Sequence, residues 1–182
     1  RGLAAVFQSV TFRTAGFNTV DFGHLHPATL MSAVALMFIG GSPAGTAGGI
    51  KTTTLAVLLL SLRAMVKRRA DVELFSRTIA KPDVYRAVAV ALISALVLFV
   101  GFLLLLMVER GKPFGDLLFE ATSAFGTVGL STGITPQLTA AGKLTITLLM
   151  YLGRIGPFSV ALLVGESRVA QYAYPEGKVM VG

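Results

Sequence analysis

The chain has 182 residues, of which 54% are hydrophobic and only 14% are charged, and its mean hydropathy is +0.75. Because about a quarter of the residues in an ordinary soluble domain are charged, this composition predicts an integral membrane protein. The formal charge of +7 does not indicate nucleic-acid binding, since the sequence contains no recognisable nucleic-acid-binding module, and the absence of cysteine excludes disulfides and thiolate metal sites.

The first predicted element is a short apolar segment at residues 3–13, which is too short to cross a membrane as a helix. A polar stretch at residues 14–19 separates it from a second apolar segment at residues 28–39. The sequence begins at Arg1 without a methionine or a signal peptide, and no long apolar helix precedes the first short one. We therefore expect the chain to be the C-terminal part, or the ordered part, of a longer polypeptide.

A glycine-rich stretch interrupts the second apolar segment, and the apolar pattern resumes at residues 50–65. Its ten residues are Gly40, Gly41, Ser42, Pro43, Ala44, Gly45, Thr46, Ala47, Gly48 and Gly49. Five glycines and a proline cannot form a regular helix here. The flanking pieces are each too short to span a membrane, so they predict one discontinuous span. Such backbone is tolerated where it lines a wet cavity or is buried in protein, and a static kink that relieves packing is the alternative.

A basic segment at residues 66–86 is predicted to be a cytoplasmic loop. Residues 61–86 carry seven basic side chains, whereas residues 109–115 carry two, and an excess of basic residues marks the cytoplasmic side of a membrane. The seven are Arg63, Lys67, Arg68, Arg69, Arg77, Lys81 and Arg86. Determination of topology is the simplest interpretation of this run, and a docking surface for a cytosolic partner is the alternative.

The second half of the chain contains three more apolar segments. Residues 87–108 lack charged side chains and, at about 1.5 Å per residue, form a helix that can cross a hydrocarbon core of roughly 30 Å. Residues 116–125 are apolar but too short to cross, which predicts a re-entrant segment. Residues 144–164 form a third apolar stretch with Arg154 near its middle. The order predicted for this half is helix, re-entrant loop and helix.

The two halves match each other at a constant offset of 113 residues. Residues 9–19, SVTFRTAGFNT, align without a gap with residues 122–132, TSAFGTVGLST. The offset still holds where LMFIG, which begins at residue 36, meets LMYLG, which begins at residue 149. A register kept over this length predicts a duplicated structural unit. The part repeated most faithfully is a short polar segment within apolar sequence, which favours a role in lining a path.

The repeated polar segments fit an ion filter, because a bare cation inside a bilayer needs uncharged oxygen ligands, which inward-pointing backbone carbonyls supply. Gly16 and Gly129 allow backbone angles that aim successive carbonyls the same way, so we expect a cation to bind at carbonyls near them. The other candidate filter residues are Thr14, Ala15, Phe17, Asn18, Thr127, Val128, Leu130 and Ser131. Ordinary re-entrant turns of a transporter are the alternative.

Three basic residues lie close to these segments in the sequence. A charge at the depth of Arg154 costs about 2.5 to 3.5 kcal/mol on insertion, so we expect this side chain to face the pore or a partner; a structural arginine is the alternative. Lys51 follows the glycine-rich stretch, where it either acts as an electrostatic brake near the ion path or reaches a carboxylate or water. Arg13 is predicted to anchor the first short helix.

Two other patterns do not indicate sites. Residues 45–52 resemble a phosphate-binding loop, but that motif requires glycine directly before the lysine, and Ile50 stands there. Asp21, His24 and His26 are too few for a metal site, and we expect them to be solvated on an extracellular loop.

The TAGFNT and TVGLST segments, the glycine-rich break and Arg154 resemble the Trk/Ktr/HKT superfamily of potassium transporters, specifically the B-type membrane subunit of Ktr systems. The resemblance covers nearly the whole chain. It implies an all-α integral membrane protein in which repeated units of helix, re-entrant pore loop and helix surround a central pore. Residues 1–65 would be the end of repeat three, residues 87–164 the complete repeat four, and residues 165–182 a cytoplasmic tail.

The same resemblance implies potassium uptake across the plasma membrane, with K⁺ at the backbone carbonyls near Gly16 and Gly129. It also implies that the filter loops lie outside, with Na⁺ as a possible coupling or activating ion. It implies no enzyme activity and no organic cofactor. Residues 40–49 would correspond to the family's intramembrane gating loop, and Arg154 to an arginine beside it, so we expect Arg154 to restrain the gate. The partners implied are membrane lipid, a second copy of the full-length subunit in a homodimer, and a cytosolic nucleotide-binding regulatory ring that faces the basic loop and the tail.

Two other functions stay open from the residues alone. A secondary transporter of an anionic solute or another small ion could use the N-terminus of the half-helix that follows residue 49. A membrane-embedded enzyme or assembly subunit fits less well, because the spans carry almost no acids or bases besides Lys51, Glu120 and Arg154.

Overall fold

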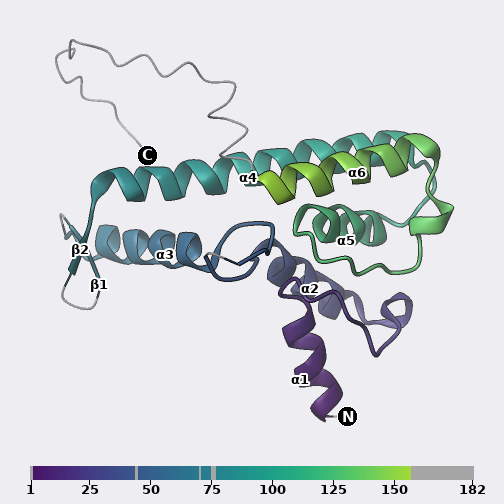
Figure 1. The fold of residues 1–182 in the computed structure, drawn as a ribbon, viewed down its shortest axis with the longest axis horizontal. Helices are drawn as coiled ribbons and strands as arrows, with labels where there is room; N and C mark the ends of the chain where they lie inside the picture. The colour runs from purple at the N-terminus through teal and green to yellow at the C-terminus, as the bar shows by residue number, and fades with distance from the viewer. Residues whose placement is uncertain (1, 44, 70, 75–76, 157–182) are drawn as a thin grey trace, which may run out of the picture.

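The structure is a computed structural model that describes residues 2–43, 45–69, 71–74 and 77–156 (Figure 1). Its elements in chain order are α1 (Gly2–Thr11), the 3₁₀ helix η1 (Phe22–His24), α2 (Pro27–Phe38), α3 (Thr52–Val66), β1 (Val72–Leu74), β2 (Arg77–Ile79), α4 (Lys81–Val108), α5 (Phe114–Phe125), the 3₁₀ helix η2 (Thr135–Gln137) and α6 (Ala140–Ile155). The architecture is helical, and the small antiparallel hairpin of β1 and β2 departs from the predicted all-α fold.

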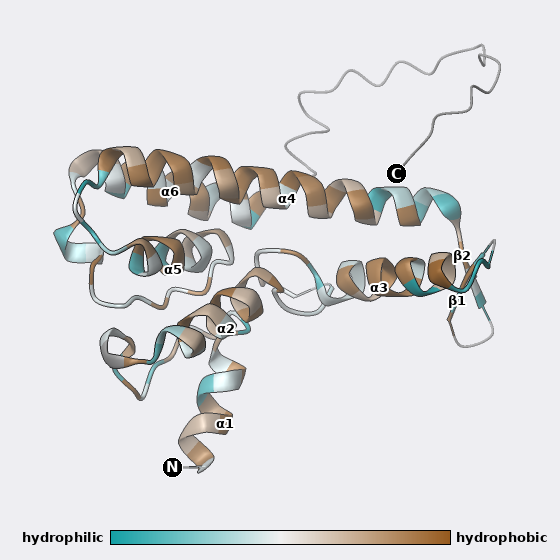
Figure 2. Cartoon of the chain, turned by 180° about the vertical axis from the view of Figure 1, so that it is seen from behind, coloured by the Kyte–Doolittle hydropathy of each residue, from teal (hydrophilic) through white to brown (hydrophobic). Residues whose placement is uncertain are grey.

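The longest helix, α4, is the element of the described chain that is long and apolar enough to cross a membrane. Its 28 residues correspond to about 42 Å, and Figure 2 shows that hydrophilic residues gather at its hairpin end. Large apolar side chains along it, including Leu92, Leu96 and Phe99, are exposed, as expected for a surface that faces lipid. The helix begins at Lys81 and not at residue 87, because Pro82 suits the first turn of a helix.

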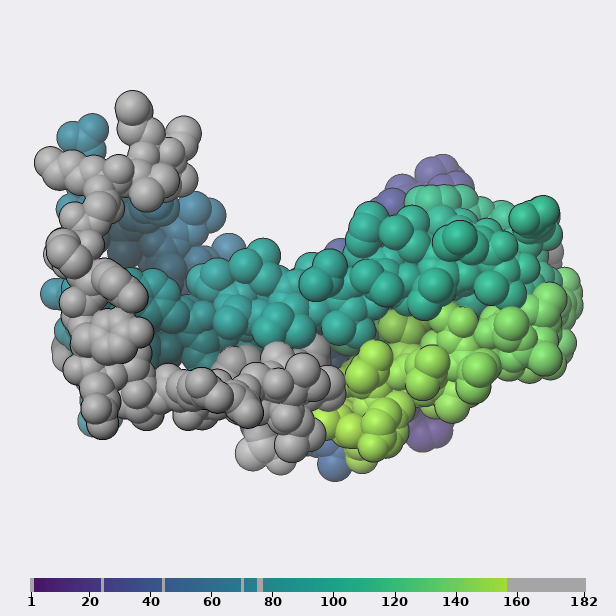
Figure 3. All heavy atoms as spheres, turned by 90° about the horizontal axis from the view of Figure 1, so that it is seen from above, coloured from purple at the N-terminus to yellow at the C-terminus, as the bar shows by residue number. Residues whose placement is uncertain are grey.

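Helices α5 and α6 begin at the same end of the molecule and run in the same direction. At this end Lys112 Nζ donates to the Gln137 carbonyl at 2.8 Å, and the Glu109 carboxylate accepts from the backbone N–H of Thr139 at 2.7 Å. The short helix α5 has 12 residues, after which the chain turns back toward the end at which α5 begins (Figure 1). Seen from above, α4 and α6 lie side by side (Figure 3). The remainder of the predicted segment 144–164, beyond residue 156, lies outside the described residues.

A close approach between α5 and α6 occurs at Gly153, where a side-chain Cβ would collide with the backbone carbonyl of Phe125. We expect Gly153→Ala to lower the free energy of unfolding of the full-length protein by about 1–3 kcal/mol, because overpacking forces the two helices apart. Thermal unfolding in detergent measures this change. Gly115→Ala is the matched control, since a Cβ at Gly115 meets no atom within 4 Å. Equal shifts for both variants would contradict the packing argument.

A cluster of apolar side chains joins the first half of the chain to the second. Phe22 is 1% exposed and lies 5.6 Å, between ring centroids, from Phe119 on α5 and 5.8 Å from Phe12. Met37 of α2 and Val128 belong to the same buried cluster. The two repeated segments therefore share a core, which brings their polar parts together.

The glycine-rich loop, residues 40–49, separates α2 from α3 at the predicted position and is closed at its base. The Gly40 N–H donates to the Ile50 carbonyl at 2.9 Å, and the Ile50 N–H donates to the Phe38 carbonyl at 3.1 Å. The Thr52 N–H bonds the Gly41 carbonyl at 3.1 Å. The two ends of this loop are thus joined by backbone pairing of Ile39 with Ile50. A loop whose ends lie close together in this way is typical of Ω-loops.

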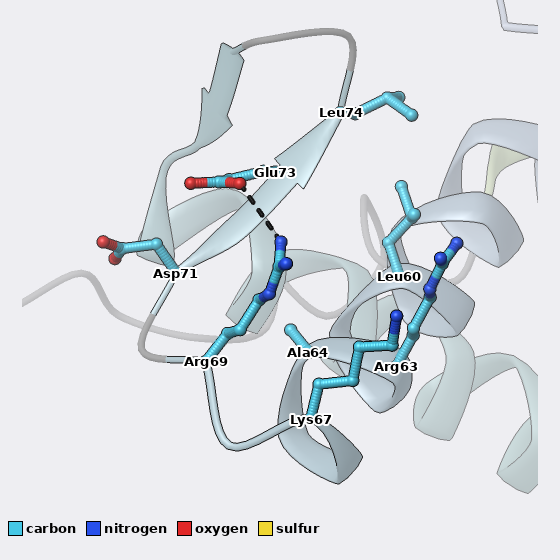
Figure 4. A pocket seen from close by; sticks show the side chains of 8 residues that line it. All are labelled: Leu60, Arg63, Ala64, Lys67, Arg69, Asp71, Glu73 and Leu74. Carbon is cyan, nitrogen blue, oxygen red and sulfur yellow. Dashed lines mark hydrogen bonds and ion pairs between the residues drawn. The ribbon is translucent and has the colours of Figure 1, made fainter.

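The segment at residues 66–86, predicted to be a loop, contains the hairpin and the first turns of α4. Beside the hairpin, the end of α3 forms a shallow cavity of about 270 Å³ (Figure 4). Arg63 and Lys67, one helical turn apart, line it together with Arg69, whose guanidinium bonds the Glu73 carboxylate at 3.5 Å. The basic run is thus partly organised by secondary structure that its composition did not indicate.

Candidate functional site

The two repeated polar segments have the same backbone conformation at equivalent positions. We call residues 12–21 the first polar loop and residues 126–134 the second polar loop. Thr14 and Thr127 both have positive φ, 66° and 53°, and Gly16 and Gly129 have φ of 77° and 87°. A non-glycine residue rarely adopts this left-handed region, so its occurrence at two positions separated by the same offset of 113 is informative.

The elements after the loops also coincide under the offset. The 3₁₀ helix η1 (Phe22–His24) corresponds to η2 (Thr135–Gln137), and α2 corresponds to the first three turns of α6. Each of these helices begins at a side-chain cap, since His26 Nδ1 accepts from the Ala28 N–H and Thr139 Oγ1 accepts from the Gly142 N–H. The match between the halves is therefore present in the backbone as well as in the sequence.

A hydroxyl at the end of each short helix holds the loop that follows it. Thr11 Oγ1 donates to the Phe17 carbonyl at 2.5 Å and accepts from the Phe17 N–H at 2.9 Å. Ser123 Oγ donates to the Leu130 carbonyl at 2.6 Å. Phe17 and Leu130 occupy equivalent positions directly after Gly16 and Gly129. Thr11 and Ser123 were not among the residues predicted from the sequence. The signal that could have marked them is a hydroxyl residue in the last turn of a short apolar helix.

The two polar loops contact each other. A side-chain Cβ at Gly16 would collide with the backbone carbonyl oxygen of Val128, so only glycine permits this approach. Gly129 is exposed, and nothing lies within 4 Å of the position of its Cβ. Phe17 is 70% exposed, whereas Leu130 is buried. The candidate filter residues of the two halves are thus brought together at Gly16 and Val128.

The glycine-rich loop lies against the second polar loop. The Gly48 N–H donates to Thr127 Oγ1 at 3.0 Å, and a Cβ at Gly48 would lie 2.7 Å from the same oxygen. A Cβ at Gly41 would lie 4.0 Å from Thr14 Oγ1 in the first polar loop. The loop therefore adjoins both of the left-handed threonines. Ala44 lies outside the described residues.

Two basic side chains bind three successive carbonyls of the glycine-rich loop. Lys51 Nζ donates to the carbonyls of Ala47 at 2.5 Å and Gly45 at 3.2 Å. Arg154, in the last turn of α6, donates to the carbonyl of Thr46 at 2.5 Å. Lys51 thus reaches backbone carbonyls and not the carboxylate that the sequence suggested as one possibility. Because cations bind carbonyl oxygens favourably, both side chains hold the loop in its present position.

The remaining candidate residues have separate surroundings. Ser131 donates its hydroxyl to the carboxylate of Glu120, a buried acid on α5. Arg13 is exposed at the end of the first short helix. Asp21 caps η1 by accepting from the Gly23 N–H at 2.9 Å, and His26 caps α2, so these two side chains have structural partners where solvation alone was expected. Within the described residues, no group of three or more His, Asp or Glu side chains could hold a metal ion.

Comparison with known proteins places this geometry in a family. The TrkH family, described as cation transport protein, matches residues 1–169. The Ktr system potassium uptake protein B of Bacillus subtilis is 42% identical over 179 residues, which are 98% of this chain and 40% of that protein. The potassium/sodium uptake protein NtpJ of Enterococcus hirae is 43% identical over 182 residues, and the Ktr system potassium uptake protein B of Vibrio alginolyticus is 37% identical over 180 residues.

These relatives match almost the whole chain, at 97% and 99% coverage for the latter two, while the chain spans about 40% of the length of each of them. A family match over nearly all of the sequence agrees with the apolar helix α4 and with the all-helical membrane core. The chain belongs to the TrkH family of cation transport proteins, as a membrane protein with B-type Ktr subunits among its relatives.

Proposed function

We propose that the full-length protein takes up K⁺ across the cell membrane through a pore to which this chain contributes two filter loops and a gate. The observation that carries the proposal is the contact between the two polar loops, each of which has a left-handed glycine at the equivalent position. The two loops have the same backbone conformation and meet at Gly16 and Val128. This arrangement suits an ion filter in which repeated loops surround a central pore. Segments outside this chain would supply the other parts of the filter.

In this proposal the carbonyls around Gly16 and Gly129 replace the hydration shell of the ion. The hydroxyls of Thr11 and Ser123 fix the carbonyls that follow each glycine, so the loops keep their shape when the ion leaves. The C-terminal ends of α1 and α5, which carry partial negative charge, precede the two loops and favour a cation. The polar loops would face the exterior, as the basic residues of the α3–α4 connection suggest.

The glycine-rich loop is proposed to be the gate. It adjoins the second polar loop through Gly48 and Thr127, and Lys51 and Arg154 bind its carbonyls. In the position described, the loop and two positive charges would lie in or beside the path of a cation. Release of the Arg154 contact would let the loop move away while the hydrogen bonds at its base keep α2 and α3 in place.

We propose K⁺ as the principal ion and Na⁺ as a coupling or activating ion. The names of three similar proteins specify potassium, and that of the Enterococcus hirae protein specifies sodium as well. Carbonyl ligands suit both cations, and K⁺ sheds its hydration shell more easily in such filters.

The cytoplasmic partner is proposed to be a nucleotide-binding regulatory ring that faces the basic end of α3 and the hairpin. The names of the Ktr relatives describe each of them as part of a "Ktr system", which indicates that they work with other components. The shallow cavity in Figure 4 is lined by the acids Asp71 and Glu73 as well as by basic residues. The adjacent positive charges of Arg63 and Lys67, at the end of α3, would suit acidic side chains of a partner. The tail at residues 165–182, proposed to lie on the same side, is outside the described residues. A homodimer of the full-length subunit would complete the assembly in the membrane.

The test is uptake of rubidium, as a tracer for K⁺, into liposomes that contain the full-length protein. We expect uptake above that of empty liposomes, with strong competition by external K⁺ and weaker competition by Na⁺. Absence of cation uptake together with uptake of an anionic solute would overturn the proposal. It would favour a secondary transporter that uses the N-terminus of α3.

A further inference from the structure

A buried carboxylate organises the second polar loop from behind. Glu120, on α5, is 4% exposed, and its carboxylate accepts hydrogen bonds from the hydroxyls of Ser131 and Thr135, the latter at 3.0 Å to each oxygen. A buried carboxylate is stable only when donors satisfy it, and two hydroxyls from one short segment do so here.

The donors of Glu120 are themselves connected. Ser131 Oγ lies 2.8 Å from Thr135 Oγ1, and it accepts from the Gly133 N–H at 2.9 Å. Since the Ser131 hydroxyl has one proton, donating it to Glu120 leaves its lone pairs for Gly133. The carboxylate therefore sets the orientation of the turn that follows Gly129.

Glu120 and Ser123 act from the same face of α5, because residues three apart on a helix are neighbours. Ser123 holds the Leu130 carbonyl, and Glu120 holds Ser131 and the residues that follow it. A cavity of about 260 Å³ lies between α5 and the loop, and Glu120, Gly129 and Ser131 are among the residues that line it. Leu130 is packed in the buried apolar cluster, whereas the part of the loop at Ser131 borders this cavity and is held by these hydrogen bonds.

The first polar loop has no equivalent of this acid. At the offset of 113, Phe7 corresponds to Glu120, Val10 to Ser123 and Phe22 to Thr135. Phe7 is 43% exposed. The first loop is held by Thr11, which lies one residue after the position equivalent to Ser123. The left-handed conformation is common to both loops, so it does not require a carboxylate. The acid is a particular feature of the second loop.

We infer that Glu120 is a positioning residue for ion selectivity, which fixes the outer part of the second polar loop and thereby the direction of the carbonyls beside Gly129. This inference rests on the proposed function as a K⁺ pathway. A loop that loses its carboxylate anchor can relax into the cavity behind it, and its carbonyls then fit K⁺ less well relative to Na⁺.

The test uses the full-length protein in liposomes and compares Glu120→Gln with Glu120→Asp and with Asp116→Asn. The readout is the ratio of the K⁺ and Na⁺ concentrations that halve rubidium uptake, which does not depend on the amount of active protein. We expect Glu120→Gln to reduce the preference for K⁺ by about tenfold, the order of effect of one hydrogen bond to a charged group. Glu120→Asp should recover part of it, and Asp116→Asn, which removes a carboxylate one turn earlier on α5, should leave it within about twofold.

A wild-type ratio in active Glu120→Gln protein would overturn the inference. Ser131→Ala provides a second variant, which removes one donor and keeps the acid, and a shift in the same direction is expected. If Glu120→Gln does not fold, a wild-type ratio in Ser131→Ala would also overturn the inference. Absence of rubidium uptake by the wild-type protein is a different result, because it contradicts the proposed function itself.

Discussion

Gly16→Ala is expected to reduce K⁺-selective uptake by the full-length protein by about a hundredfold, whereas Gly129→Ala is expected to reduce it by about tenfold. Both glycines are left-handed, and this conformation costs another residue about 1–2 kcal/mol, or roughly tenfold. At Gly16 the new Cβ also collides with the Val128 carbonyl of the other loop, which adds about 1–3 kcal/mol of overpacking. Rubidium uptake in liposomes, with K⁺ and Na⁺ as competitors, measures both effects.

Gly111→Ala is the matched control for these variants. Gly111 has a φ of 83° and no atom within 4 Å of its Cβ position, so the substitution carries a similar backbone cost outside the polar loops, between α4 and α5. Its ratio of K⁺ to Na⁺ competition should equal that of the wild type. If Gly129→Ala proved more damaging than Gly16→Ala, contact between the loops would not be what makes glycine necessary at residue 16.

Arg154→Ala should raise the rate of rubidium flux through the full-length protein by about tenfold when no cytosolic partner is present. The substitution removes the hydrogen bond from the guanidinium to the Thr46 carbonyl, and a bond to a charged group contributes about 1.5–3 kcal/mol. Loss of this bond favours positions of the glycine-rich loop that leave the path open. Flux from preloaded liposomes, measured without added regulatory protein, reports the change.

Arg154→Lys should have an intermediate effect, since lysine keeps the charge but lacks the planar guanidinium. Arg110→Ala is the control, because it removes an exposed positive charge next to the far end of α4. Unchanged flux in Arg154→Ala would show that the contact with Thr46 is structural and does not restrain a gate.

Much of the helical architecture could be predicted from apolar length and breaks. The sequence indicated an interruption after α2 because several glycines and a proline cannot sustain a helix. It did not indicate the start of α4 at Lys81, since the first turns of this helix are charged and look like the loop before them. Nor did it indicate β1 and β2, because each strand has three residues and depends on pairing with the other.

The residues of the candidate site could be predicted where the sequence pattern occurs twice. They could not be predicted where the site depends on contacts between residues that are distant in the sequence. Gly16 and Gly129 stand out because two copies of the same pattern mark them. The contact between Arg154 and Thr46 joins residues 108 positions apart, and local pattern cannot supply it. Glu120 was visible as an acid in an apolar helix, but its hydrogen bonds to the second polar loop depend on the fold of that loop.

The binding of Lys51 and Arg154 to the carbonyls of residues 45–47 has an electrostatic consequence. These oxygens have the same chemistry as those proposed to bind K⁺, so in the proposed closed position the protein would supply its own cations as substitutes for the transported one. Withdrawal of the two side chains would remove a positive barrier and would also expose three negative dipoles. If the two side chains withdrew before the loop itself moved, the local potential beside these carbonyls would therefore change from repelling a cation to attracting it.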